Sequence, residues 1–164
     1  MTYRAVRARR YAMRGCEHPL SDRYRCALGQ RPSKVRPVPE LVAWMDRNSE
    51  RLYVSVLMIA EIEDGIAKAR RGGAIRKTAR LREWLETLVH LYSSRILPFD
   101  LPAARIAGAL SDRARSRGHT AGFADLAIGA IARCHALTIL TGNLKRYAAL
   151  GVAAHDPLRQ LPPD

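Results

Sequence analysis

Apolar and polar positions follow a regular pattern from residue 37 onward. Apolar side chains recur every three or four residues over 39–45, 57–69, 75–92 and 103–117, which predicts amphipathic helices. Short runs rich in β-branched and apolar residues at 52–56, 96–99 and 137–141 predict buried strands. Residues 123–135 are rich in Ala and Ile and predict a buried helix. A short helical turn around 147–150 and a last edge strand at 152–154 complete the pattern.

Residues at the ends of these segments support the same elements. The first helix starts with prolines and Glu40, as is typical of helix starts, and Ser55 is placed to cap the helix over 57–69. Gly72 and Gly73 separate two helices, and Gly118 ends another. Strands that alternate with helices predict an α/β fold, with a mostly parallel sheet covered by helices on both faces.

Residues 1–36 differ from the rest of the chain, because they show neither helical nor strand periodicity. We interpret residues 1–33 as an irregular basic arm with short helical turns, and residues 34–164 as the folded domain. The chain carries a formal net charge of +13, and residues 1–36 hold 10 of the 28 Lys and Arg but only two acidic residues. Such a basic balance favours a polyanionic partner.

Composition excludes several classes of protein. The longest nearly apolar run, over 52–62, is too short to cross a bilayer, and no apolar signal segment follows the basic N-terminus. The three cysteines contain no CxxC pair, and Cys16 with His18 would leave a metal two ligands short. No P-loop, GxGxxG or Ser-His-Asp elbow occurs. We therefore expect a reduced cytoplasmic protein with no membrane association.

Polar groups follow the predicted strands, at the sheet edge where parallel α/β folds bind ligands. Glu61 lies on the helix after the first strand, Asp125 opens the buried helix, and Thr141 and Asn143 follow the third strand. Carboxylates gathered at such an edge are typical of Mg²⁺ sites acting on phosphate. Simpler roles stay open: Asp125 as a helix-start residue, Glu61 as part of a solvated helix face, and Asn143 as a turn former.

Six segments together resemble the VapC-type PIN-domain toxins. They are PELVAWMD at 39–46, LYVSV at 52–56, AEIEDGI at 60–66, ILPFD at 96–100, FADLAI at 123–128 and LTILTGN at 137–143. The resemblance covers about residues 34–160 in unbroken order. It implies a PIN-like three-layer α/β/α fold and the toxin component of a type II toxin–antitoxin pair.

The resemblance also implies a site and its partners. In that family four acidic residues surround Mg²⁺ or Mn²⁺ and cleave RNA phosphodiester bonds, a small antitoxin blocks the site, and the chains commonly pair as homodimers. Glu61 matches the second acidic position and Asp125 the third, so both are expected as metal ligands. Thr141 and Asn143 match the polar cluster that closes the site.

Two of the four acidic positions lack a carboxylate in this chain. The first is expected near Arg25 or Cys26, on a central strand whose motif is missing, and the fourth is Arg146. One hypothesis is that residues 1–33 are read from a shifted frame, which the coding DNA would settle; the alternative is a genuine basic extension. We therefore expect an Mg²⁺-dependent endoribonuclease with impaired activity. The alternatives are an inactive PIN-like protein that binds RNA or an antitoxin, and a chain that folds poorly.

Overall fold

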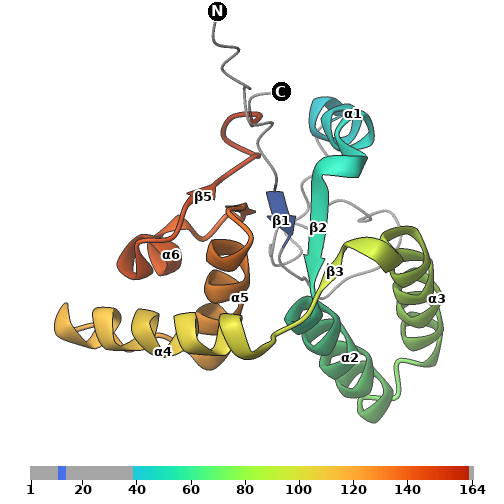
Figure 1. Ribbon diagram of the computed structural model, residues 1–164. Coiled ribbons are helices and arrows are strands. Elements are labelled where there is room, and N and C mark those ends of the chain that lie inside the picture. Colours follow the sequence, from blue (N-terminus) through green and yellow to red (C-terminus); the bar gives the residue numbers. More distant parts are fainter. Residues whose placement is uncertain (1–10, 14–38, 163–164) are drawn as a thin grey trace, which may run out of the picture.

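The computed structural model describes residues 11–13 and 39–162, which form a parallel sheet with helices on both faces (Figure 1). The strands are β1 (Tyr11–Met13), β2 (Leu52–Ser55), β3 (Ile96–Leu97), β4 (Thr138–Leu140) and β5 (Ala154–His155). The helices are α1 (Pro39–Arg47), α2 (Val56–Arg71), α3 (Ile75–Tyr92), α4 (Leu101–Ser116), α5 (Phe123–Cys134) and α6 (Leu144–Leu150). Short 3-10 turns, η2 (Ser49–Arg51) and η3 (Ser93–Arg95), lead into β2 and β3. The predicted α/β class is confirmed.

The sheet has the strand order β3-β2-β1-β4-β5, and every neighbouring pair is parallel. β1 is central: Ala12 is in register with Tyr53 on one side and with Ile139 on the other. Because all the strands point the same way, their carboxyl ends share one edge of the sheet. The helices that follow β2 and the loop that follows β4 start at that edge.

Two apolar clusters cover the two faces of the sheet. One joins α1, α2 and α3 to Leu52 and Val54 of β2, and the other joins α4, α5 and α6 to Ile139 of β4. Leu140 belongs to the first cluster and its neighbour Ile139 to the second, as the alternation of side chains along a strand requires. In Figure 1 the same two groups of helices lie on opposite sides of the strands. The expected three-layer α/β/α arrangement is therefore present.

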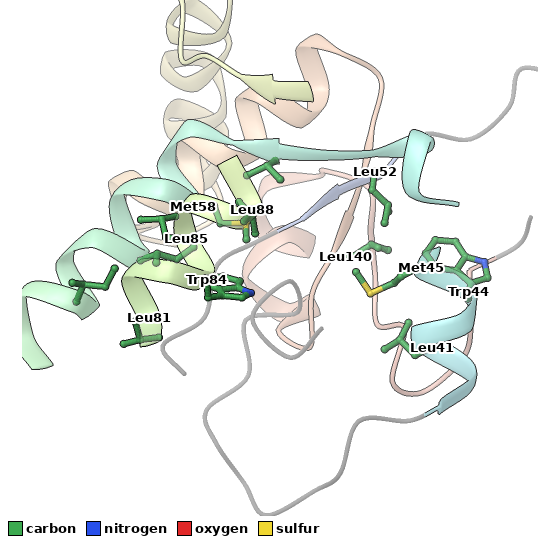
Figure 2. Close-up of a cluster of buried hydrophobic side chains, with 13 residues drawn as sticks. Leu41, Trp44, Met45, Leu52, Met58, Leu81, Trp84, Leu85, Leu88 and Leu140 are labelled. Atoms are coloured by element: carbon green, nitrogen blue, oxygen red, sulfur yellow. The ribbon is translucent and has the colours of Figure 1, made fainter. Parts of the chain in front are cut away.

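The first cluster contains the two tryptophans of the chain, each almost fully buried. Figure 2 shows Leu41, Trp44 and Met45 of α1 beside Leu52 and Leu140 of the sheet. In the same view the α3 side chains lie with Met58 of α2; they are Leu81, Trp84, Leu85 and Leu88. These four are the residues that helical periodicity predicts to point inward from 75–92.

The prediction of an arm without strand structure is wrong at residues 11–13, which form β1. Without β1, the facing edges of β2 and β4 would leave buried backbone N–H and C=O groups unpaired. Even a strand of three residues therefore stabilises the sheet at this place. The central strand is thus supplied by a segment other than the one expected near Arg25 and Cys26. The described residues do not include Arg25 and Cys26, nor Cys16, His18 and the predicted helical turns of the arm. The domain boundary at 33/34 also lies there and stays a prediction.

Within the described ranges, 11–13 and 39–162, no helix is both long and apolar enough to cross a membrane.

Candidate functional site

The carboxyl-terminal edge of the sheet holds the residues that the sequence singles out. Ser55 ends β2 and caps α2, its hydroxyl oxygen accepting a hydrogen bond from the Leu57 amide at 3.0 Å. This cap fixes where α2 begins, and Glu61 therefore lies in its second turn, half-buried. β4 ends at Leu140 on the same edge, and Thr141 follows it directly.

Asp125 lies in the first turn of α5, with only 6% of the residue exposed. The helix starts at Phe123 after Gly122, and its residues Ile128, Ala130 and Ala132 are buried in the second cluster, which fixes the helix against the sheet. A carboxylate in the first turn is favoured by the positive end of the helix dipole. The helix therefore holds this carboxyl group at a place from which water is largely excluded.

Arg146 of α6 forms an ion pair with Asp125. Its Nη1 donates a hydrogen bond to Asp125 Oδ2 at 3.0 Å, and 53% of the Arg146 side chain is exposed against 8% of the Asp125 side chain. The next residue, Tyr147, is fully buried and anchors α6 in the second cluster. The guanidinium therefore reaches the carboxylate from a helix that is itself fixed to the core.

Thr141 and Asn143 form the turn between β4 and α6. Thr141 is 1% exposed, and its hydroxyl oxygen accepts a hydrogen bond from the Asn143 amide at 3.1 Å. The Thr141 amide donates to the carbonyl of His155 at 2.9 Å. Asn143 is exposed at the N-cap of α6, where its side chain makes no capping hydrogen bond. The geometry gives Thr141 a structural role in this turn and leaves the Asn143 side chain facing solvent.

The site thus brings Asp125 together with Arg146, and Thr141 with Asn143. Glu61 reaches the same edge of the sheet on α2, which contacts α5. Over 11–13 and 39–162, however, no three His, Cys, Asp or Glu side chains are gathered so that they could hold a metal ion. In the described part of the chain a guanidinium, and not a third carboxylate, lies against Asp125, so these residues form no ready-made metal centre, although the oxygens of Asp125 and Glu61 are of the kind that Mg²⁺ accepts.

Comparison with known proteins identifies the fold and the family. The sequence model of the PIN domain matches residues 37–150, which is most of the chain. The chain belongs to the PIN-domain family. The chain is 34% identical over 128 residues to toxin FitB of Neisseria gonorrhoeae, covering 77% of this chain and 90% of FitB. It is also 34% identical over 125 residues to the VapC ribonuclease Y4jK of Sinorhizobium fredii, covering 76% of this chain and 88% of that protein.

Solved structures agree with this assignment. The crystal structure of FitAcB from Neisseria gonorrhoeae superposes with a TM-score of 0.66 at 35% identity, covering 78% of this chain and 89% of that chain. DNA-bound VapBC from Salmonella typhimurium shares the fold at 20% identity, with a TM-score of 0.59 and coverage of 73% and 85% of the two chains. The expected likeness to VapC-type PIN toxins is confirmed.

The Arg146 ion pair is the feature of the candidate site that the sequence did not predict. The sequence marks Arg146 only as a basic residue at an expected acidic position, three residues after Asn143. The structure places that position directly against Asp125. The spacing to Asn143 could therefore have located the residue, but only the geometry shows which carboxylate it neutralises.

Proposed function

We propose that the protein is the toxin component of a type II toxin–antitoxin pair, built as a PIN-type endoribonuclease whose activity is impaired. The observation that supports it best is the buried Asp125 carboxylate at the carboxyl edge of a PIN-family sheet. Relatives named as a toxin and as a VapC ribonuclease, each 34% identical, favour the same activity. The impairment follows from Arg146, which offsets the charge of Asp125.

Mg²⁺ or Mn²⁺ is the cofactor that this proposal expects. Such an ion would supply Lewis-acid chemistry, activating water for the hydrolysis of a phosphodiester. Asp125 and Glu61 are the side chains of this chain that would ligate it, and oxygen ligands suit both ions. With Asp125 already paired, we expect the ion to bind weakly and cleavage to be slow.

Metal-dependent cleavage of single-stranded RNA by the purified 164-residue protein tests the proposal. We expect slow cleavage in Mg²⁺ or Mn²⁺, which EDTA stops and Asp125→Asn removes, because the variant loses the buried negative charge. Asp112→Asn, at an exposed position on α4, is the control and should leave the rate unchanged. Robust cleavage would show that the site is not impaired. No cleavage by any of the three proteins would rule out the nuclease and leave the binding function described next.

A PIN-like protein that binds RNA without cutting it is the second candidate, and the charge of the folded part favours it. Residues 68–82, which join the end of α2 to the start of α3, carry seven basic and no acidic residues. They are Lys68, Arg70, Arg71, Arg76, Lys77, Arg80 and Arg82, all exposed except the half-buried Lys77. We call this segment the basic tip. Elsewhere in 39–162 the basic and acidic residues nearly balance, at 11 and 12.

Salt-dependent binding to single-stranded RNA in EDTA tests the basic tip. Replacing Arg70, Arg71 and Arg76 with Gln removes three cations from it. If all three contact phosphate, the slope of log K against log salt should fall by about 2, and binding at low salt should weaken by about tenfold or more. The matched variant replaces Arg105 and Arg115 of α4 and Arg117 at its C-cap, all three exposed, and should change the slope much less. Equal losses in both variants would mean that net charge, not the tip, attracts the RNA.

A small antitoxin is the protein partner that the proposal implies. The structural relatives include FitAB bound to an IR36 DNA fragment, 31% identical to this chain with a TM-score of 0.62. We propose that this chain acts in the cytoplasm, as a homodimer held by an antitoxin encoded beside it. Co-purification with the product of the adjacent gene, and the mass of the free toxin in solution, test both parts.

A further inference from the structure

We propose that Arg146 is the resident cation of this site: its guanidinium takes the place of a divalent ion at Asp125, which binds metal only when the ion pair opens. The inference rests on the proposed function only in taking Asp125 as a site residue. It explains why a PIN-family chain contains a carboxylate at the expected edge of the sheet and yet no gathered set of carboxylates in its described part.

The geometry of the pair supports direct competition. Arg146 Nη1 lies 3.0 Å from Asp125 Oδ2, which is hydrogen-bonding distance for a charged donor and acceptor. The carboxylate is almost buried while half of the arginine side chain is exposed, so the guanidinium approaches from the solvent side. A metal ion from solution would have to bind beside a positive charge or displace it. Either route weakens binding at Asp125.

The backbone keeps Arg146 in this position. α6 begins directly after the turn formed by Thr141 and Asn143, and the buried Tyr147 and Leu150 hold it against α5. A side chain at position 146 therefore lies beside the first turn of α5 whatever its charge. Exchanging the guanidinium for a carboxylate changes the formal charge at this position by two and leaves the anchoring residues in place.

The chain contains a second ion pair that serves as a control. Arg159 Nε lies 3.4 Å from Asp156 Oδ2, and the Asp156 side chain is 9% exposed, close to the 8% of Asp125, while the Arg159 side chain is 82% exposed. Asp156 lies after β5 and is no part of the proposed site. Loss of Arg159 therefore leaves an equally buried carboxylate without its cation at a place where no metal binding is expected.

Titration with Mn²⁺, followed by electron paramagnetic resonance, tests the inference without RNA or cleavage. We compare the wild type with Arg146→Ala, Arg146→Asp, Arg146→Lys and Arg159→Ala. Arg146→Asp should bind Mn²⁺ about tenfold or more tightly than the wild type, and Arg146→Ala should fall between them. Arg146→Lys and Arg159→Ala should behave as the wild type. Adding Asp125→Asn to Arg146→Asp should abolish the gain.

Wild-type affinity equal to that of Arg146→Asp would overturn the inference, as would an equal gain from Arg159→Ala. Thermal unfolding without metal shows that each variant is folded, and Mn²⁺ should raise the melting temperature of Arg146→Asp more than that of the wild type. The two proposals can fail separately. If Arg146→Asp binds Mn²⁺ more tightly but no RNA is cleaved, the nuclease function is ruled out and the inference about Arg146 stands. If the wild type cleaves RNA and its Mn²⁺ affinity does not change when Arg146 is replaced, the inference about Arg146 fails and the nuclease function stands.

Discussion

Replacing Trp84 with alanine is expected to lower the free energy of unfolding by about 3–5 kcal/mol. Trp84 is 2% exposed and lies in the cluster that joins α3 to α2 and to β2 (Figure 2). Its removal loses a large apolar surface and leaves a cavity that the surrounding leucines fill only partly. Urea unfolding followed by circular dichroism measures the loss. In a domain of this size the melting temperature should fall by roughly 2–4 °C for each kcal/mol.

Leu91→Ala is the matched control for this substitution, because Leu91 lies on the same helix with 57% of the residue exposed. Its loss should change the free energy of unfolding by no more than about 0.5 kcal/mol. Similar losses from the two variants would mean that α3 does not pack as described. A broad, uncooperative transition in the unmodified protein would instead support the view that the chain folds poorly.

Replacing Ala12 with proline is expected to destabilise the fold by about 3 kcal/mol or more, enough to leave little soluble native protein. Ala12 is the middle residue of β1, which pairs with β2 on one side and β4 on the other. Proline has no amide proton, so one ladder hydrogen bond is lost whichever neighbour receives it, and proline is poorly tolerated in central strands. Soluble yield and cooperative thermal unfolding provide the measurement.

Ala12→Gly is the control for the proline variant, since glycine keeps the amide proton and should cost only about 1 kcal/mol. If the proline variant is as stable as the glycine variant, residues 11–13 do not supply the central strand. That outcome would revive the interpretation that the true strand is missing from this chain. It would also make the shifted-frame hypothesis for residues 1–33 the next one to examine in the coding DNA.

Local sequence rules sufficed for most elements of the fold. The α3 helix spans residues 75–92 as predicted, because its apolar positions repeat over five turns and Gly72-Gly73 separates it from α2. Ser55 caps α2 as its sequence position suggests. β1 could not be predicted in this way, because three residues are too few to show a period. Its pairing depends on neighbours that lie about 40 and more than 100 residues away in the chain.

The candidate site also has one part that the sequence predicts and one part that it does not. The position of Asp125 follows from a helix start and a family motif, both readable in the sequence. The ion pair of Asp125 could not be predicted from the sequence. Its partner Arg146 lies 21 residues further on, in another helix, and comes beside Asp125 only after α5 and α6 pack. Thr141 was predicted as a site residue, and its hydroxyl oxygen accepts a backbone hydrogen bond in the turn before α6.

The central place of β1 has a consequence for the order in which the protein is made. β1 leaves the ribosome first, yet its partner β4 is synthesised only after residue 138, several seconds later at roughly 5–20 residues per second. Until then the sheet cannot close, and Thr141 and Arg146 do not exist. A nascent chain therefore carries no assembled site until Arg146 has been synthesised. The same late closure leaves the edges of β1 and β2 unpaired during translation, and unpaired strand edges are general sites of aggregation.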